Sequence, residues 1–344
     1  METKLWTVDK NVENDGTYPQ LQEAANLLQQ GEVVAFPTET VYGLGADAMK
    51  NEAVRKIFEA KGRPSDNPLI VHIADAEQLT PIVSSISPLA HVLMETFWPG
   101  PLTLIFPSSD RVATRVTAGL NTVAVRMPDH PVARALLKMA NVPVAAPSAN
   151  VSGRPSPTLA SHVYADLNGK IAGIVDGGAT GVGVESTVLD ITSEVPTILR
   201  PGGVTKEQLE AVIGPVELDK GLQDESLKPK APGMKYKHYA PKAPLTIVEG
   251  SPSYIEQLAS QQQGKKVGIL TTEENADFYR ADYVLACGKR ADLATVAAHL
   301  YDTLRQFDEV DVDVIYSESF PKEGMGIAIM NRLVKAAGHQ IIVE

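Results

Sequence analysis

The sequence has a single cysteine among its 344 residues, Cys287. That scarcity excludes a disulfide framework and a cysteine-rich zinc site. No run approaches the roughly 18 apolar residues that a membrane-spanning helix needs. Residues 1–15 are polar and mixed in charge, without the apolar core of a signal segment. We therefore expect a cytoplasmic protein of a reducing compartment, with no membrane contact.

Basic charge is also scarce. The 31 lysines and arginines are outnumbered by 42 aspartates and glutamates, which gives a net charge of −11. The acidity is spread over both halves of the chain. This balance argues against a protein whose main task is to grip nucleic-acid backbone.

The composition is otherwise that of a globular protein, with 44% hydrophobic and 21% charged residues. At roughly 100–200 residues per domain, the length predicts two domains. The periodic pattern stops over 215–244, which holds five prolines and several lysines. We therefore predict domains over 1–214 and 245–344. Because the segment 215–244 is long for a simple connection, we expect it to be a linker that also closes over the first domain's site as a lid.

Short apolar runs alternate with helical patterns in the first domain, which predicts an α/β fold. The expected strands are Val33–Phe36, Leu69–Ile73, Leu102–Phe106, Val123–Arg126, Val144–Ala146, Ile171–Val175 and Thr187–Ile191. The expected helices are Asn51–Ala60, Pro88–Phe97, Pro131–Ala140 and Lys206–Ile213. In the first helix, Asn51 is the expected N-cap and Gly62 follows the C-terminal end.

The second domain repeats the alternation over about 100 residues. The expected strands are Leu245–Val248, Val267–Leu270, Tyr283–Ala286 and Val314–Tyr316, and the expected helices are Ser253–Gln262, Leu293–Phe307 and Ile327–Ala337. This order predicts a smaller Rossmann-like unit with a parallel sheet.

The common catalytic and nucleotide fingerprints are absent. There is no Walker A motif, no H-E-x-x-H and no context for a Ser–His–Asp triad. The glycine run Gly177–Gly183 lacks a terminal lysine, so it is either a turn or a backbone cradle for an anion. No residue is predicted to act as a general acid or base.

Polar side chains nevertheless gather where predicted strands end. The threonines of Pro37–Gly45 either face a ligand or satisfy their own turn. Lys61 and Arg63 flank a helix end, where a guanidinium on a stiff loop suits phosphate. His72 lies in an apolar strand, where a hydrogen-bonded core histidine is the commoner outcome.

Arg126 ends another predicted strand. It needs an anionic partner, which is either a carboxylate of the protein, such as Asp129, or one of the substrate. Hydroxyl, amide and arginine side chains recur in Pro147–Asn150, Gly153–Ser156 and Leu199–Gly203. Together these groups predict a site for an anionic ligand with many oxygens, and a reaction that relies on positioning and charge neutralisation.

Six ordered motifs and one linker motif resemble the YrdC-domain family in its long form with an additional C-terminal domain. The motifs are Pro37-Thr-Glu-Thr-Val-Tyr-Gly-Leu, Lys61-Gly-Arg-Pro with Asn67-Pro-Leu and His72-Ile, Trp98-Pro-Gly-Pro-Leu-Thr, Val125-Arg-Met-Pro, Ala146-Pro-Ser-Ala-Asn, Glu185-Ser-Thr-Val and Lys235-Tyr-Lys-His-Tyr-Ala-Pro. The resemblance spans nearly the whole chain and implies a twisted mixed sheet with helices in the first domain.

The implied activity is the condensation of L-threonine, bicarbonate and ATP to threonylcarbamoyl-AMP and pyrophosphate. The product then passes to a separate transferase complex that modifies tRNA. Threonine carbamate is already an anionic nucleophile for the α-phosphate, which is consistent with the absence of a predicted catalytic base. Mg²⁺ is expected with ATP, held mainly by the phosphates.

The resemblance also implies roles for individual residues. The threonine pocket would contain Thr40, His72, Arg126, Ala146 and Ser186. The ATP site would contain Lys61, Arg63, Asn67, Thr122, Ser148, Asn150, Ser156, Arg200 and, from the linker, His238.

Two other functions stay open. A module for double-stranded RNA or tRNA would use a basic cluster, and a weak RNA contact is compatible with the enzyme as well. The cluster is Lys50, Arg55, Lys56, Lys61 and Arg63, interleaved with Glu52, Glu59 and Asp66. A carbamoyl-transfer enzyme of hydrogenase maturation shares the domain, but the zinc-finger cysteines expected beside it are absent.

Overall fold

The structure is a computed structural model that describes residues 2–9, 19–222 and 238–344. The chain divides into two compact units. The N-terminal unit comprises 1–152, 157–181 and 185–235, and the C-terminal unit comprises 153–156, 182–184 and 236–344. Two short loops that precede the main C-terminal segment, 153–156 and 182–184, therefore belong to the C-terminal unit.

The N-terminal unit is built on an eleven-stranded mixed sheet. Its strands are β1 (Lys4–Thr7), β2 (Val34–Phe36), β3 (Gly43–Asp47), β4 (Ile70–His72), β5 (Leu102–Pro107), β6 (Thr122–Arg126), β7 (Val144–Ala145), β8 (Gly173–Asp176), β9 (Thr187–Asp190), β10 (Thr197–Arg200) and β11 (Glu217–Leu218). Their order is β1-β8-β2-β3-β7-β4-β6-β5-β9-β10-β11. The predicted α/β fold with a mixed sheet is confirmed.

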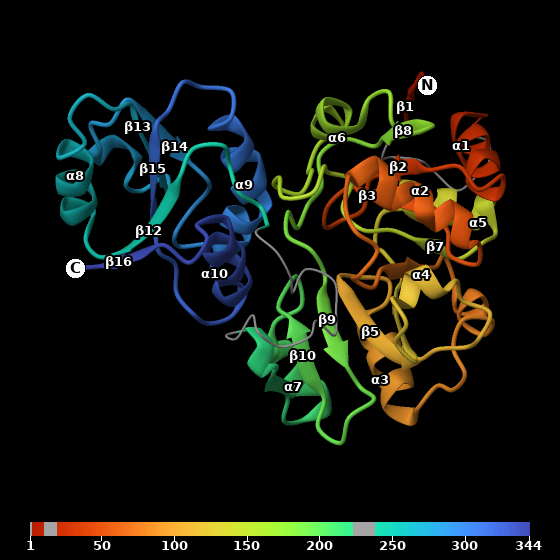
Figure 1. Ribbon diagram of the computed structural model, residues 1–344. Coiled ribbons are helices and arrows are strands. Elements are labelled where there is room, and N and C mark those ends of the chain that lie inside the picture. The colour runs from red at the N-terminus through yellow and green to blue at the C-terminus, as the bar shows by residue number, and fades with distance from the viewer. Residues whose placement is uncertain (1, 10–18, 223–237) are drawn as a thin grey trace. The chain divides into compact units, whose positions relative to one another are not determined.

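Helices cover both faces of this sheet (Figure 1). They are α1 (Pro19–Gln29), α2 (Asn51–Lys61), α3 (Pro88–Phe97), α4 (Thr114–Thr117), α5 (Pro131–Ala140), α6 (Ala160–Leu167) and α7 (Lys206–Ile213), with 3₁₀ turns at Ala76–Leu79 and Lys220–Leu222. One apolar cluster includes buried residues of α1 and α5, and a second includes buried residues of α2, α3, α4, α6 and α7. Neighbouring residues of β2 alternate between the two clusters, as the pleat of a strand requires.

Strand directions bring several chain segments to one edge of the sheet. β4 and β6 are parallel, and His72 pairs with Arg126 at their carboxyl ends. β5 is antiparallel to β6 and parallel to β9, so the amino end of β9, preceded by Ser186, lies at the same edge. β10 is antiparallel to β9, which returns Arg200 to that edge.

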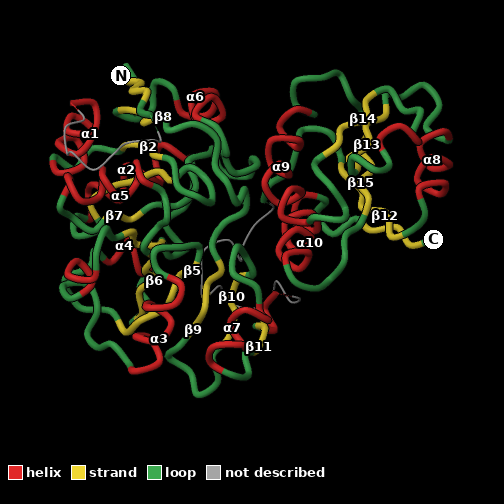
Figure 2. Tube along the Cα trace, turned by 180° about the vertical axis from the view of Figure 1, so that it is seen from behind, coloured by secondary structure: helices red, strands yellow, loops and turns green. Residues whose placement is uncertain are grey.

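The C-terminal unit has a five-stranded, wholly parallel sheet in the order β14-β13-β15-β12-β16. Its strands are β12 (Leu245–Glu249), β13 (Val267–Thr271), β14 (Tyr283–Ala286), β15 (Val314–Glu318) and β16 (Ile341–Val343). Its helices are α8 (Pro252–Ser260), α9 (Leu293–Gln306) and α10 (Met325–Ala336), with a 3₁₀ turn at Ala276–Phe278. Helix α8 lies on one face of this sheet, and α9 and α10 lie on the other (Figures 1 and 2). The predicted smaller parallel unit is confirmed.

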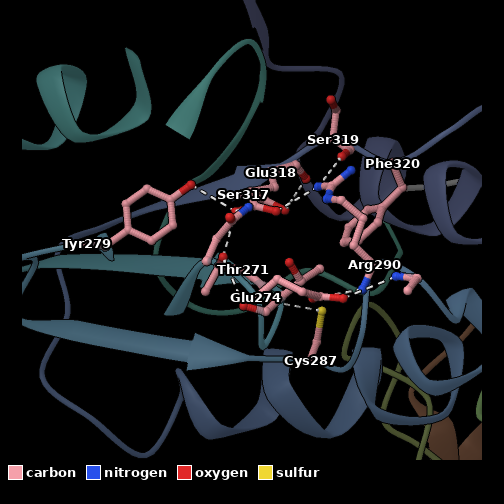
Figure 3. Close-up of polar contacts among 12 residues, drawn as sticks. Thr271, Glu274, Tyr279, Cys287, Arg290, Ser317, Glu318, Ser319 and Phe320 are labelled. Carbon is pink, nitrogen blue, oxygen red and sulfur yellow. Dashed lines mark hydrogen bonds and ion pairs between the residues drawn. The ribbon is translucent and has the colours of Figure 1, made fainter. Parts of the chain in front are cut away.

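A buried carboxylate holds the carboxyl ends of β13 and β15 together. Glu318 Oε1 accepts hydrogen bonds from Thr271 Oγ1 at 2.6 Å, Tyr279 Oη at 2.9 Å and Asn275 Nδ2 at 2.9 Å. Glu318 Oε2 pairs with Arg290 Nη2 at 2.6 Å. Figure 3 shows Thr271, Tyr279 and Arg290 converging on Glu318. Both carboxylate oxygens are satisfied, so this network is a structural lock between two strands.

The chain's one cysteine lies beside this lock. The Cys287 thiol donates to the backbone carbonyl of Thr271 at 3.2 Å and is fully buried. Burial, with the nearby charge of Glu318 as a smaller cause, raises the pKa of Cys287 to about 12.

One expectation about α2 is wrong. The helix starts one residue earlier than a cap at Asn51 would require, so Lys50 is the N-cap, and its side chain makes no capping hydrogen bond to the helix. Asn51 Oδ1 instead accepts from the backbone N–H of Arg115, which ties α2 to α4. The expected C-terminal glycine is confirmed, because Gly62 has φ +61° and its N–H bonds back into the last turn.

Candidate active site

His72, Arg126, Ser186 and Arg200 lie at one end of the strands of the N-terminal sheet, which we call its polar edge, and Arg126 is at its centre. Its side chain is 3% exposed at the end of β6. Nη1 donates to Thr40 Oγ1 at 2.8 Å, and Nη2 pairs with Glu39 Oε2 at 2.6 Å. The sequence predicted a carboxylate of the protein, such as Asp129, or one of the substrate as the anionic partner, and in the structure a protein carboxylate pairs with Arg126, that of Glu39 in place of Asp129. Burial lowers the pKa of Arg126, and the charge of Glu39 opposes that shift.

The loop that carries Glu39 is held by its own threonine. Thr38 Oγ1 donates to the carbonyl of Val41 at 2.7 Å and accepts from the backbone N–H groups of Thr40 and Val41. Thr38 therefore does what an ordinary turn threonine does. Thr40 Oγ1 lies 2.8 Å from Thr38 Oγ1 and accepts a hydrogen bond from Arg126, so Thr40 links this turn to Arg126.

His72 is neutral. Its ring is buried, meets Phe36 edge-on at 6.0 Å and has Nδ1 3.2 Å from the carbonyl of Ile70. Burial, and then the positive charge of Arg126, lower the pKa of His72 to about 3. At neutral pH the ring can offer a hydrogen bond but no charge.

Ser186 and Arg200 form the other end of the edge. Arg200 donates from Nε and Nη2 to the carbonyl of Ser186 at 3.1 and 3.0 Å, and from Nη2 to its Oγ at 3.2 Å. Ser186 Oγ also lies 2.8 Å from Thr103 Oγ1. A Cβ on Gly202 would come within 2.2 Å of the carbonyl oxygen of Glu185, so the chain after β10 can press against this segment only with a glycine there.

Lys61 joins the end of α2 to the loop after β7. Its Nζ donates to the carbonyls of Ser148 at 2.5 Å and Asn150 at 2.7 Å. Ala146 starts this loop, and its N–H donates to the carbonyl of Ile70 on β4. The structure therefore brings Ala146, Ser148, Asn150 and Lys61 into one neighbourhood beside β4.

Three other residues predicted to contact the nucleotide are Arg63, Asn67 and Thr122. Arg63 follows α2 and has its guanidinium 6.0 Å from the ring centroid of Phe58. Asn67 is fully buried before β4. Thr122 begins β6 whereas Arg126 ends it, which separates the two by about 13 Å at the usual rise of a strand. Thr122 is therefore not at the edge that Arg126 occupies.

Ser156 and His238 belong to the C-terminal unit. Ser156 is fully buried. His238 packs against Tyr239 with the ring centroids 5.4 Å apart. Most of the predicted lid, residues 223–237, lies outside the described residues, and the predicted roles of this segment and of His238 stay predictions.

Sequence reasoning missed Glu39 and Thr103 as members of the site. Glu39 stands inside the quoted motif Pro37-Thr-Glu-Thr, and its charge was the available signal. Its pairing with Arg126 has no local sequence signal, because the two residues are 87 positions apart.

The described residues contain no cluster of side chains that would coordinate magnesium on its own. Among residues 2–9, 19–222 and 238–344, no three His, Cys, Asp or Glu side chains come together as metal ligands. In the same ranges, no helix is long and apolar enough to cross a membrane.

The basic cluster considered for RNA is largely neutralised. Arg55 pairs with Glu52 and Glu59, Lys56 pairs with Glu32, and Lys50 pairs with Asp47. Lys61 is buried at 3% exposure. This surface therefore presents little uncompensated charge to a phosphate backbone.

Comparisons with known proteins agree on one family. The profile described as telomere recombination, for Sua5, YciO and YrdC proteins, matches residues 26–202. The profile described as the C-terminal domain of threonylcarbamoyl-AMP synthase matches residues 204–338. The threonylcarbamoyl-AMP synthase of Bacillus subtilis (strain 168) is 62% identical over 99% of this chain and 100% of its own length. That of Pyrococcus abyssi is 49% identical over 93% of this chain and 94% of its own length.

A solved structure resembles the whole chain. The crystal structure of P. abyssi Sua5 complexed with L-threonine superposes with a TM-score of 0.93 at 46% identity, covering 99% of this chain and 100% of that one. The structure of Escherichia coli YciO, at 22% identity and a TM-score of 0.52 over 58% of this chain, supports the fold of the N-terminal unit alone.

Proposed function

The chain belongs to the threonylcarbamoyl-AMP synthase family, and from that premise we propose that the polar edge around Arg126 is the site where L-threonine is joined to AMP. The enzyme class, a tRNA-modifying transferase that uses threonine and ATP, follows from the family. We further propose bicarbonate as the third substrate. The observation that carries the proposal is the buried Arg126, which is held by Glu39 and Thr40 at the end of β6.

Threonine would lie with its carboxylate on Arg126. Thr40 and Ser186 would supply hydroxyl groups, and the backbone at Ala146 would complete the pocket. Neutral His72 would line it without adding charge, since its pKa of about 3 keeps the ring unprotonated. The hydroxyl groups of this pocket are preorganised, because Thr40 is hydrogen-bonded to Arg126 and Ser186 is hydrogen-bonded to Arg200.

ATP would lie beside threonine. Lys61, Arg63 and Arg200 would neutralise the phosphates, and Asn67, Ser148, Asn150, Ser156 and His238 would contact other nucleotide atoms. Thr122, about 13 Å from Arg126 along β6, would contact the part of the nucleotide farthest from threonine. The ammonium group of threonine would first lose a proton, and the neutral amine and bicarbonate would then form the carbamate with loss of water. A carbamate oxygen then bonds to the α-phosphorus while the bond to the pyrophosphate oxygen breaks. This step needs charge neutralisation rather than a strong protein base.

Magnesium would enter with ATP. The described residues offer no cluster of three ligands, so phosphate and water oxygens would form most of the coordination shell. When bound, the ion would supply charge neutralisation at the phosphates.

We also propose that the product passes to a separate transferase complex that modifies tRNA, and that the reaction takes place in the cytoplasm. Residues 1–214 would perform the chemistry, 215–244 would close over it and 245–344 would anchor the closing segment. Closure would protect the carbamate and the mixed anhydride from water.

The test is pyrophosphate release from ATP by the purified full chain. We expect release only when L-threonine and bicarbonate are both present, with threonylcarbamoyl-AMP identified by mass spectrometry. Release that continues without either co-substrate would contradict the proposal. A function confined to RNA binding predicts no release at all, and the paired basic residues give it no support.

A further inference from the structure

The ion pair at the centre of the site is incomplete on both sides. Arg126 Nε and Glu39 Oε1 are buried and have no hydrogen-bond partner among the described residues. Their other atoms are engaged, since Nη2 meets Oε2 at 2.6 Å and Nη1 donates to Thr40. One buried donor and one buried acceptor therefore stand on adjoining groups of opposite charge, and buried polar atoms normally have partners.

Glu39 is also fixed in place. Its backbone carbonyl accepts a hydrogen bond from the N–H of Gly181 at 3.1 Å. The turn around Thr38 holds the backbone on its other side. With its side chain 13% exposed and tied to Arg126, this carboxylate is positioned as firmly as its partner.

Charge balance limits which ligand the pair can accept. Arg126 and Glu39 together are neutral, and neighbouring His72 is unprotonated at neutral pH. A ligand carrying only a carboxylate would leave the buried Arg126–Glu39 pair with one net negative charge, which is costly. A ligand with a carboxylate and an ammonium group adds none.

We propose that Glu39 receives the ammonium group of the amino-acid substrate and so makes the pocket selective for a zwitterion. This rests on the proposed function, which places the substrate carboxylate on Arg126. The free donor of Arg126 and the free acceptor of Glu39 then bind the two charged ends of one α-amino acid. Glu39 is a specificity-determining residue for the reaction.

The competing explanation is that Glu39 only neutralises Arg126. The two roles predict different responses to Glu39→Gln, which removes the charge and preserves the shape. Loss of a mere counter-ion would leave Arg126 with an uncompensated charge and strengthen binding of every carboxylate. Loss of an ammonium site would weaken threonine while strengthening a carboxylate without an amine.

The experiment measures binding of two ligands by titration calorimetry on the full chain. The ligands are L-threonine and (3R)-3-hydroxybutanoate, which is threonine without its amino group. For Glu39→Gln we expect threonine affinity to fall at least about tenfold, as for loss of a hydrogen bond between charged groups, and hydroxybutanoate affinity to rise. Glu39→Asp keeps the charge and should still prefer threonine. Glu52→Gln, which changes an exposed carboxylate on α2, is the matched control.

Each outcome decides one question. If both affinities of Glu39→Gln move in the same direction, or neither moves, the role in ammonium recognition is wrong. If Glu39→Gln fails to fold by circular dichroism, Glu39→Asp decides: equal affinity for the two ligands contradicts the proposal. If the wild-type chain itself does not bind threonine, the proposed function fails, and that result is separate from the inference about Glu39.

Discussion

Arg126 is the side chain expected to contribute most to threonine binding. A buried guanidinium at a strand end costs free energy unless an anion pairs with it, and among the described residues Arg126 pairs with the carboxylate of Glu39. We predict that Arg126→Ala weakens threonine binding by about 3 kcal/mol, roughly a hundredfold, while ATP binding changes little. Titration calorimetry with each ligand measures this. Arg134→Ala, on the exposed side of α5, is the control, and unchanged threonine affinity would refute the assignment.

His72 predicts a pH effect on stability. Its folded pKa of about 3 lies below the ordinary value of 6.5. Between pH 6.5 and pH 3, His72 is protonated in the unfolded chain and neutral in the folded chain. The free energy of unfolding therefore decreases as the pH drops below about 6.5. From pH 7 to pH 5 this single group should cost about 2 kcal/mol.

The measurement is urea denaturation of the wild type and of His72→Asn at both pH values. The variant should lose about 2 kcal/mol less than the wild type over that interval. Equal losses would mean that the folded ring titrates near its ordinary pKa.

The two arginines proposed for the phosphates can each be tested by replacement with lysine. Arg200 uses Nε and Nη2 on the same carbonyl of Ser186, a geometry that a single ammonium cannot reproduce. We predict that Arg200→Lys and Arg63→Lys each lower turnover at low ATP at least about tenfold. Steady-state pyrophosphate release gives the answer. Wild-type turnover in Arg63→Lys would show that its guanidinium is not required.

Among the elements, long periodic segments were the predictable ones. Helix α2 has Val54, Ile57 and Phe58 on one buried face and a left-handed glycine after its end, and both signals are local. The strands β4, β6 and β9 were visible as apolar runs for the same reason.

Elements that depend on distant partners were not visible. Strand β3, Gly43–Asp47, contains two glycines, and its strand conformation comes from pairing with β2 and β7. A Cβ on Gly45 would come within 2.8 Å of Phe36 and Val144, so close packing explains the glycine that suggested a loop. Strand β1 and helix α6 were missed as well. Helix α1 was also missed, although its buried Leu21, Ala25 and Leu28 have the same helical spacing that made α2 predictable. The partnership of Glu39 with Arg126 spans 87 positions and has no local signature.

The lock between β13 and β15 makes a prediction about the C-terminal unit. Glu318→Ala leaves Thr271, Tyr279 and Asn275 without their acceptor, and a buried donor left unsatisfied typically costs about 1–3 kcal/mol. Arg290 is 38% exposed and stays hydrated, so the loss of its ion pair should add little. Glu318→Gln keeps one acceptor and should cost less. Denaturation curves of both variants test this. A loss below about 1 kcal/mol for Glu318→Ala would mean that the network contributes little.

For the whole molecule, net charge determines the expected affinity for RNA. A chain with a net charge of −11, whose cluster around Arg55 and Lys56 is paired internally, should bind RNA weakly and only at low salt. We predict that the double variant Arg55→Ala, Lys56→Ala leaves synthase activity and RNA affinity within about twofold of the wild type. Filter binding to tRNA at two salt concentrations measures it, and a large loss of affinity would reopen the RNA-binding function.

The buried thiol of Cys287 has a practical consequence. With a pKa of about 12 and no exposure, it holds almost no thiolate at neutral pH and should ignore maleimide reagents. The native chain therefore has no reactive thiol that would compete with a cysteine introduced for site-directed labelling. One cysteine introduced on the exposed side of α5 and another on α8 would carry a donor–acceptor dye pair without removal of any native residue. Energy transfer between the dyes would then report directly whether adding threonine and ATP changes the distance between the two units.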